Sequence, residues 1–397
     1  MLEFTQHAVR SVQLLRQTAK GWCEVMQMFY EPTAEHIAKL SSNWTASYSG
    51  GKDSTSLVIW IEWLRRSGQI NCPHPKLVQS DTEVEYAILA DTTRRMINTL
   101  TTSGWECVLV KPLIHEKLYN RILGIGNSPV HPGERKMRWC TRSTKIDPME
   151  RWRKTQEDGM ILTGVRYGES TIRDEKLKRP SCGAGGECGL PEVNRNTYGP
   201  IISWTLCQVI DWLNGAVAKP VRSKIDDLLK ITGDLLAIYD VKYGQVGFDG
   251  SRDVESVARF GCIGCPAIEA TEHAPKSTVL RQGADSSLNE LYSVMFDARR
   301  HKNRAVRFNN KKQRWGAGPI RMAVRKQLFA RVMDIQRRAD ITLITSEDEQ
   351  FIRQCWRNKV YPRGWSEEDE ATVEPEPELI QLMVKGVSTL PRKDGAK

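Results

Sequence analysis

The sequence has no apolar run near the ~20 residues that a membrane helix needs, so no membrane span is expected. Residues 1–17 mix acidic and basic groups with spaced apolar side chains and have no uninterrupted apolar centre. This pattern predicts an amphipathic helix and not a signal peptide. We therefore expect a cytoplasmic protein.

Two common phosphate-binding motifs are also missing. Neither G-x-x-x-x-G-K-[ST] nor G-x-G-x-x-G occurs, which excludes a Walker A loop and the usual dinucleotide fingerprint. A disulfide framework is disfavoured as well, because the ten cysteines occur without a secretion signal. Free thiols, metal ligands or redox groups explain those cysteines better.

The size and composition fit a globular protein of one or two domains. The 397 residues are 40% hydrophobic and 27% charged, as in ordinary soluble proteins. We expect a helical segment over 1–41, an α/β domain over 42–219, and a mainly helical region over 220–365 that carries cysteines and basic residues. An acidic helix and a partly disordered tail are expected over 366–397.

Short strand-like segments alternate with amphipathic helices from Asn43 onward. The segments NWTASYS, KLVQSDT, WECVLVK and MILTGV have the character of strands, and the stretch from Asp53 to Arg66 has that of a helix. This order predicts a parallel sheet with helices on both faces and a ligand site at the carboxyl ends of its strands. A mobile loop is predicted over 123–142, where Gly, Pro and cations accumulate.

The strongest local signal is the sequence SYSGGKDST, which follows a predicted strand and precedes a predicted helix. Two adjacent glycines permit a tight turn whose backbone N–H groups reach phosphate oxygens, and the helix N-terminus favours the same anion. A turn that only joins the strand to the helix is the alternative. The candidate ligand-binding residues are Ser47, Ser49, Gly50, Gly51, Lys52, Asp53, Ser54 and Thr55.

Positive charge is concentrated in one segment. Residues 299–338 hold 14 Lys and Arg residues against one acidic residue, Asp334, within a chain of net charge +10. Such density favours a polyanion such as nucleic acid, because neutralised phosphates release counterions. A solvated basic helix face is the alternative. The candidate nucleic-acid ligands are Arg304, Arg307, Lys311, Lys312 and Arg314.

Cysteine spacing indicates a metal or cluster site. Cys262 and Cys265 form a C-x-x-C pair, a spacing that can hold zinc or an iron–sulfur cluster from one loop. Buried or incidental thiols are the alternative.

The glycine turn resembles the SGGxDS signature of the PP-loop, or adenine nucleotide α-hydrolase-like, superfamily, whose members split ATP between its α and β phosphates. The resemblance implies ATP as the nucleotide, with Asp81 and Thr82 near adenosine and a carboxylate there able to bind Mg²⁺. The segment from Gly164 through Arg166 to Arg173 resembles a G-x-R-x-x-x-S-x-x-R element of sulfonucleotide reductases. Its two arginines would grip phosphates with paired donors.

The cysteine segments resemble the same superfamily. The stretch Trp139–Pro148 is similar to one in sulfonucleotide reductases, where paired cysteines and a distant C-x-x-C bind a [4Fe–4S] cluster. Trp139 replaces the first cysteine of that pair here, and a glycine-rich loop offers a replacement ligand. The expected cluster ligands are Cys140, Cys188, Cys262 and Cys265, with Cys182 as the alternative fourth ligand.

The chain resembles the DNA phosphorothioation proteins DndC and SspD more closely, through a W-C-T sequence and an R-F-G-C-x-x-C segment. In that family a further cysteine precedes the C-x-x-C, whereas residues 241–261 contain none. The resemblance implies an ATP pyrophosphatase that adenylylates the DNA backbone for sulfur incorporation in bacterial defence. Implied partners are a cysteine desulfurase and other phosphorothioation subunits. The implied catalytic residues are Lys52, Asp53, Arg166, Arg173 and Lys145.

Three other functions stay open. A sulfonucleotide (PAPS or APS) reductase would need a C-terminal Glu-Cys-Gly-like tail, but here Glu187-Cys188-Gly189 lies in mid-sequence and no cysteine follows Cys355. A tRNA-thiolating PP-loop enzyme would keep ATP and sulfur and change the acceptor. A non-catalytic nucleic-acid-binding subunit with a decayed nucleotide site is disfavoured by the intact glycine turn.

Overall fold

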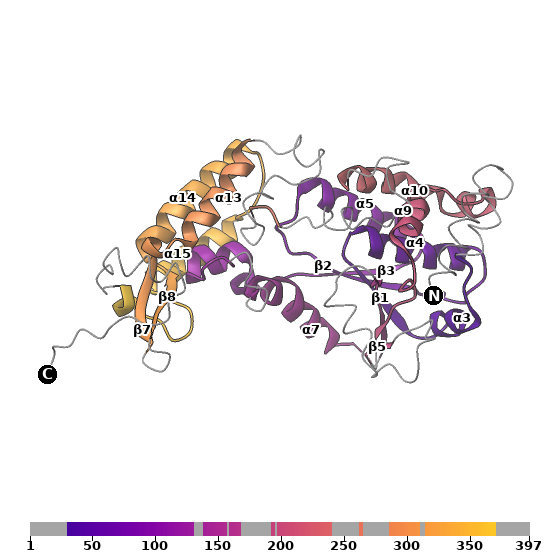
Figure 1. Cartoon of the computed structure of the whole chain (residues 1–397), viewed down its shortest axis with the longest axis horizontal. Coiled ribbons are helices and arrows are strands. Elements are labelled where there is room, and N and C mark those ends of the chain that lie inside the picture. The colour runs from indigo at the N-terminus through magenta and orange to yellow at the C-terminus, as the bar shows by residue number, and fades with distance from the viewer. Residues whose placement is uncertain are drawn as a thin grey trace, which may run out of the picture.

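The computed structural model describes residues 30–130, 138–156, 159–167, 192–194, 197–239, 262–264, 286–309 and 314–370. Within them lie a six-stranded sheet with its helices and a second region built of helices and a hairpin (Figure 1). None of the helices in these ranges combines the length and the apolar character that crossing a membrane requires.

The sheet has the strand order β3-β2-β1-β4-β6-β5. Its parallel strands are β1 (Trp44–Tyr48), β2 (Lys76–Ser80), β3 (Glu106–Val110), β4 (Met160–Leu162) and β6 (Thr197–Tyr198), and β5 (Glu192–Asn194) pairs antiparallel with β6. The chain proceeds from β1 through β2 to β3 in one direction and then returns to the other side of β1. The carboxyl end of β1 is therefore a topological switch point, where sheets of this kind bind ligands.

Helices cover both faces of the sheet, which confirms the predicted fold class. In Figure 1, α4 (Lys52–Arg66), α5 (Ala87–Thr102), α9 (Leu206–Leu213) and α10 (Lys219–Ile238) lie above the sheet, and α3 (Ala34–Leu40) and α7 (Asp147–Arg153) lie below it. All residues of α4 from Ser54 to Leu64 are buried, because the helix lies between the sheet and the outer helices α9 and α10.

The core of the sheet region continues past the domain boundary expected at 219–220. Side chains along α10, such as Ile225 and Leu228, join the same hydrophobic cluster as those of α4 and α5. An ion pair of 2.7 Å between Arg66 and Asp227 adds a polar contact at the surface of this packing. The apolar stripe of α10 thus belongs to the core of the sheet region.

The C-terminal region is mainly helical, as predicted, and has its own hydrophobic cluster. This cluster involves α13 (Ser286–Arg299), α14 (Met322–Arg338), α15 (Ser346–Arg357) and one end of a hairpin. The hairpin consists of β7 (Arg304–Asn309) and β8 (Arg314–Ile320), and the short helix η7 (Glu367–Glu370) lies against β7.

Much of the segment predicted as a mobile loop over 123–142 is packed, so that prediction was wrong for its ends. A π-helical turn, η2 (Asn120–Ile125), contributes to the second cluster, and α6 (Trp139–Thr141) and η4 (Arg142–Ile146) follow. The support comes from distant residues: buried Arg325 donates hydrogen bonds to the carbonyl groups of Gly124 at 3.1 Å and of Val360 at 2.9 Å. Residues 131–137 of this segment lie outside the described residues.

Candidate functional site

The SYSGGKDST segment forms a turn between β1 and α4, at the switch point of the sheet. Gly50 has a φ of +72°, in the left-handed region that favours glycine. A Cβ at Gly50 would lie 2.2 Å from Oγ1 of Thr93, so the turn packs closely against α5. Gly51 is the N-cap of α4 and has no side chain that could cap the helix. The turn therefore has the elements of an anion site, a glycine pair and a helix N-terminus that its own N-cap residue does not cap.

Hydroxyl groups hold the shape of this turn. Oγ of Ser54 lies 3.0 Å from Oγ of Ser49, accepts the N–H of Ser49 at 3.2 Å and donates to the carbonyl of Gly51 at 3.1 Å. Thr55 is buried and its hydroxyl donates to a tyrosine of β1, so it faces the core. Ser47 lies within β1 itself. Of the hydroxyl groups predicted to bind phosphate, those of Ser49 and Ser54 line the turn.

Asp53 is held between two cations. Its Oδ2 lies 2.7 Å from Nζ of Lys52, and its Oδ1 lies 2.5 Å from Nε of Arg166. Burial alone would raise the pKa of Asp53, but the charges of Lys52 and Arg166 outweigh it and hold that pKa below its usual value. The carboxylate is therefore ionised, and it fixes the ammonium group of Lys52 beside the turn.

The loop after β4 lies directly against the N-terminus of α4. Gly164 has no room for a side chain, because a Cβ would lie 2.8 Å from backbone atoms of both Asp53 and Ser54. Arg166 is only 1% exposed and also donates from Nη1 to the carbonyl of Trp204 at 3.1 Å. Its Nη2 has no hydrogen-bond partner within the described ranges. A phosphate bound by Arg166, as predicted, would therefore meet the two N–H groups of Nη2 and the second N–H of Nη1.

Charged side chains gather where β2 ends, around the predicted adenosine and magnesium residues. Asp81 accepts the N–H of Glu83 at 3.0 Å and lies 3.4 Å from Nζ of Lys111. Glu83 has a φ of +60°, an uncommon conformation for a residue with a side chain. Burial would raise the pKa of Glu83, but Lys117 and Lys111 lower it. Thr82 is buried, so Asp81 is the more accessible of the two predicted residues, and Mg²⁺ there would compete with Lys111.

The segment that carries Cys140 is fixed to the loop between β2 and α5. Cys140 lies on α6, and its carbonyl accepts the hydroxyl of Thr144 at 2.9 Å. Ser80 donates to the carbonyl of Thr144 at 3.2 Å, and Nζ of Lys145 lies 3.6 Å from Glu85. Burial raises the pKa of Glu85 despite the nearby Lys145. Lys145, one of the predicted catalytic residues, therefore lies at the carboxyl end of β2.

The segment that carries Cys262 reaches the same loop. The N–H of Ile263 donates to the carbonyl of Val84 at 2.9 Å, and the hydroxyl of Tyr119 donates to the carbonyl of Ile263 at 3.3 Å. Cys262 and Trp139, the neighbour of Cys140, both pack against the second hydrophobic cluster. Among the residues that the structure describes, no group of three His, Cys, Asp or Glu side chains is arranged to hold a metal ion.

Several predicted site residues cannot be placed. Those that lie outside the described residues are Arg173, Cys182, Cys188, Cys265, Lys311 and Lys312.

Many cations of the basic segment over 299–338 have partners within the protein. Arg304 donates to the carbonyl of Gly318 at 2.7 Å. Arg307 lies 4.1 Å from the ring centre of Trp365 and belongs to the exposed surface of β7. Arg314 begins β8. Others that pair with acidic residues are Arg300, Arg331, Arg337 and Arg338. Part of the positive charge therefore stabilises the fold, and nucleic-acid binding by this segment stays a prediction.

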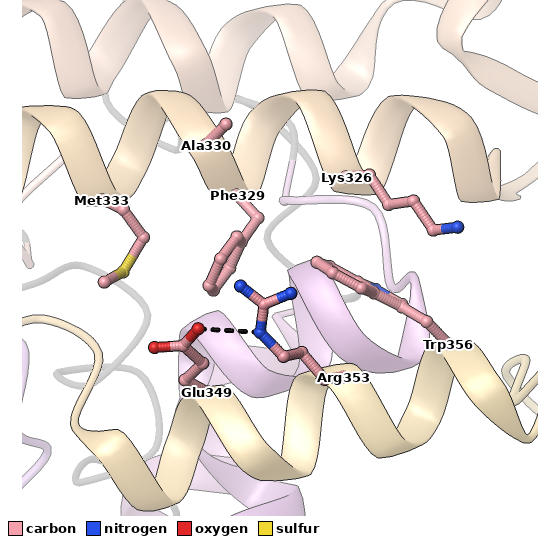
Figure 2. A pocket seen from close by; sticks show the side chains of 7 residues that line it. All are labelled: Lys326, Phe329, Ala330, Met333, Glu349, Arg353 and Trp356. Carbon is pink, nitrogen blue, oxygen red and sulfur yellow. Dashed lines mark hydrogen bonds and ion pairs between the residues drawn. The ribbon is translucent and has the colours of Figure 1, made fainter.

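A hollow lies between α14 and α15 (Figure 2). Figure 2 shows the guanidinium group of Arg353 between the rings of Phe329 and Trp356. Nε of Arg353 lies 2.7 Å from a carboxylate oxygen of Glu349. Because this side chain occupies the middle of the hollow, we assign no ligand to it.

Sequence reasoning missed two residues beside the glycine turn and a third beside the loop that follows β2. Thr93 packs against Gly50, and Tyr239, at the end of α10, accepts the N–H of Lys52 at 3.3 Å. Lys117 bridges the loop after β2 and the first turn of α15. No local pattern marks these residues, because each reaches the site from an element that is distant in sequence.

Comparisons with known proteins find only distant structural matches. No protein-family profile matches the chain, and a search of curated proteins finds no match. A phosphoadenylyl-sulfate (PAPS) reductase from Candida auris, in a phosphate complex, is 13% identical over 51% of this chain and 88% of that chain, with a TM-score of 0.31. The U34-tRNA thiolase NcsA from Methanococcus maripaludis, with its [4Fe-4S] cluster, is 11% identical over 68% and 80%, with a TM-score of 0.31. Similarity of this degree carries no argument about activity.

Proposed function

We propose that this chain is an ATP pyrophosphatase of the PP-loop type, which splits ATP into AMP and pyrophosphate. One observation carries the proposal: the turn over residues 49–54 lies at the switch point of a parallel sheet and opens α4, whose N-cap residue, Gly51, has no side chain to cap the helix. Backbone N–H groups in that position bind phosphate. Lys52, fixed by Asp53, adds a positive charge beside them.

Positioning and charge neutralisation would supply most of the catalysis. The N–H groups of the turn would hold phosphate oxygens, and Lys52 would offset charge on the departing pyrophosphate. Mg²⁺ needs only one or two carboxylates when phosphates complete its shell, and Asp81 is a candidate. Asp53 and Arg166 act as positioning residues, because they hold each other and Lys52 in place.

We propose the DNA backbone as the acceptor, in a cytoplasmic reaction that replaces an oxygen by sulfur. A phosphodiester oxygen is a poor leaving group, whereas an adenylylated oxygen departs as AMP when a sulfur nucleophile attacks. The support is the sequence resemblance to DndC and SspD, together with the basic segment over 299–338. A cysteine desulfurase would supply the sulfur, and other phosphorothioation subunits would assist.

We further propose that Cys140 and Cys262 belong to one [4Fe–4S] site, with Cys265 and either Cys188 or Cys182. The support is that the segments of Cys140 and Cys262, far apart in sequence, are both hydrogen-bonded to the end of β2 or to the loop that follows it. Cysteine thiolates are the usual ligands of such clusters. A bound cluster would supply iron and sulfide for sulfur chemistry near this loop.

Replacing Lys52 with methionine is expected to lower pyrophosphate release from ATP by about 100-fold, because a charge aimed at the leaving group is lost. Release of AMP and pyrophosphate would be measured with DNA, with tRNA and with a sulfonucleotide in parallel. Lys76→Met is the control, since Lys76 pairs with Glu106 at the amino end of β2. Orthophosphate as the product would refute the proposal, and activity with tRNA alone or reduction of the sulfonucleotide would favour those alternatives.

Protein purified without oxygen is expected to be coloured and to contain iron. Cys140→Ala and Cys262→Ala should each remove more than half of that iron, as roughly expected when one of four ligands is lost. Cys72→Ala and Cys107→Ala are matched controls, because both side chains pack against the core of the sheet region. A colourless and iron-free wild-type protein would eliminate the cluster.

A further inference from the structure

The first backbone N–H of α4 already has an acceptor, and the acceptor comes from the far end of another helix. The N–H of Lys52 donates to Oη of Tyr239, the residue that follows α10, at 3.3 Å. Nζ of Lys52 lies 5.7 Å from the centre of the Tyr239 ring. A Cβ added to Gly51 would lie 3.4 Å from the same hydroxyl oxygen. The phenol group therefore lies directly against the glycine turn.

This contact has the chemistry of a weak substitute for phosphate. The first N–H groups of a helix lack acceptors within the helix, and Gly51 has no side chain to supply one. A neutral hydroxyl oxygen satisfies the N–H of Lys52, but it accepts a hydrogen bond less strongly than a charged phosphate oxygen does. Because α10 packs on α4 and α5, the fold itself positions the phenol there.

We infer that Tyr239 is a placeholder for phosphate. Its hydroxyl accepts a hydrogen bond from the N–H of Lys52 in the unliganded protein and is displaced when a phosphate group binds. The inference rests on the proposed function and adds to it a positioning residue outside the glycine motif. Competition of this kind weakens the retention of phosphate ligands. It therefore favours release of pyrophosphate after ATP has been split.

Tyr239→Phe isolates the hydroxyl group, since phenylalanine keeps the ring beside Lys52. This variant should bind pyrophosphate and ATP roughly twofold to tenfold more tightly than wild type in calorimetric titrations, as expected when one competing hydrogen bond is removed. The amide hydrogen of Lys52 should exchange faster in the unliganded variant and at the wild-type rate once pyrophosphate is bound. Tyr30→Phe, which removes a hydroxyl that donates to the carbonyl of Gln208, should change neither quantity.

The outcomes separate the two claims. Equal or weaker pyrophosphate binding by Tyr239→Phe, in an assay where the wild-type protein binds, would overturn the placeholder and leave the proposed function standing. A wild-type protein that binds neither ATP nor pyrophosphate would overturn the proposed function and the inference together.

Discussion

Asp53→Asn is expected to lower the free energy of unfolding by about 3 kcal/mol, because it leaves a buried guanidinium group without its counter-charge. Arg166 is only 1% exposed, and its Nε lies 2.5 Å from Asp53. Asparagine has nearly the same shape as aspartate, so the loss reports charge rather than packing. Urea unfolding followed by tryptophan fluorescence would measure it, since Trp60, Trp204 and Trp212 lie in the same core.

The same substitution should also reduce pyrophosphate release by at least tenfold, as roughly expected when a charge beside the reacting phosphates loses its position. The double variant Asp53→Asn/Arg166→Met should regain a large part of the stability without regaining activity, because the buried guanidinium group is gone and only the partly exposed ammonium group of Lys52 lacks its counter-charge. Asp226→Asn removes an exposed ion pair with Lys230 on α10 and should stay within about 0.5 kcal/mol of wild type. A double variant as unstable as the single one would contradict the charge argument.

The effect of Asp53→Asn should depend on pH in a defined direction. The folded-state pKa of Asp53 is lowered, so its ion pairs contribute their full stability above the unfolded-state pKa of about 4. That contribution is lost as the pH falls through the lowered folded-state pKa. Wild type and variant should therefore differ by a constant amount between about pH 5 and pH 7 and converge below about pH 4. A difference that grows on acidification would reverse the sign and refute this account.

Gly50→Ala is expected to destabilise the fold by about 3 kcal/mol, from backbone strain and a steric clash together. The φ of +72° disfavours alanine, and its Cβ would lie 2.2 Å from Oγ1 of Thr93, a buried side chain. Relief of this clash would shift the glycine turn away from α5, so ATP binding should weaken by at least tenfold, an order-of-magnitude estimate for a displaced phosphate site. Thermal unfolding and calorimetric titration would measure the two effects.

Gly68 provides a matched control for the destabilisation that comes from the backbone conformation alone. Its φ is also +72°, but no atom lies within 4 Å of the position where a Cβ would be added. Gly68→Ala should therefore lose only about 1 kcal/mol and keep its affinity for ATP. Adding Thr93→Ala to Gly50→Ala should restore part of the affinity, because the obstructing hydroxyl is removed. Equal losses in Gly50→Ala and Gly68→Ala would show that the contact with α5 is unimportant.

The architecture around the glycine turn could be predicted from the sequence because its determinants are local. Alternating strands and helices specified the parallel sheet, and the pair Gly50 and Gly51 marked the turn. Gly164, singled out in the sequence, packs against the backbone of α4, where a side chain would not fit. Such features depend on a few neighbouring residues, and a single sequence contains them.

The partners of buried charges could not be predicted in the same way. Arg166 was expected to bind a phosphate, which stays a prediction, and its ion pair with Asp53 was not foreseen. Arg325 contributed to the count of basic residues, yet it is buried and bonded to carbonyl groups from three segments. No sequence motif marked Tyr239 as a neighbour of the glycine turn. Whether an arginine or a tyrosine faces solvent, a ligand or a carbonyl depends on residues hundreds of positions away, which a local pattern does not record.

The loop over residues 81–85 belongs to both halves of the protein. The carbonyl of Val84 accepts a hydrogen bond from the segment that carries Cys262. Lys117 forms ion pairs with both Glu83 and Asp348, which lies in the first turn of α15. The same loop follows β2, next to the strand that leads into the glycine turn. A cut of the chain between the sheet region and the C-terminal region would break these contacts. Recombination with a related protein could exchange the sheet region and the C-terminal region only together. An exchange of one region alone would need a loop over residues 81–85 that fits both.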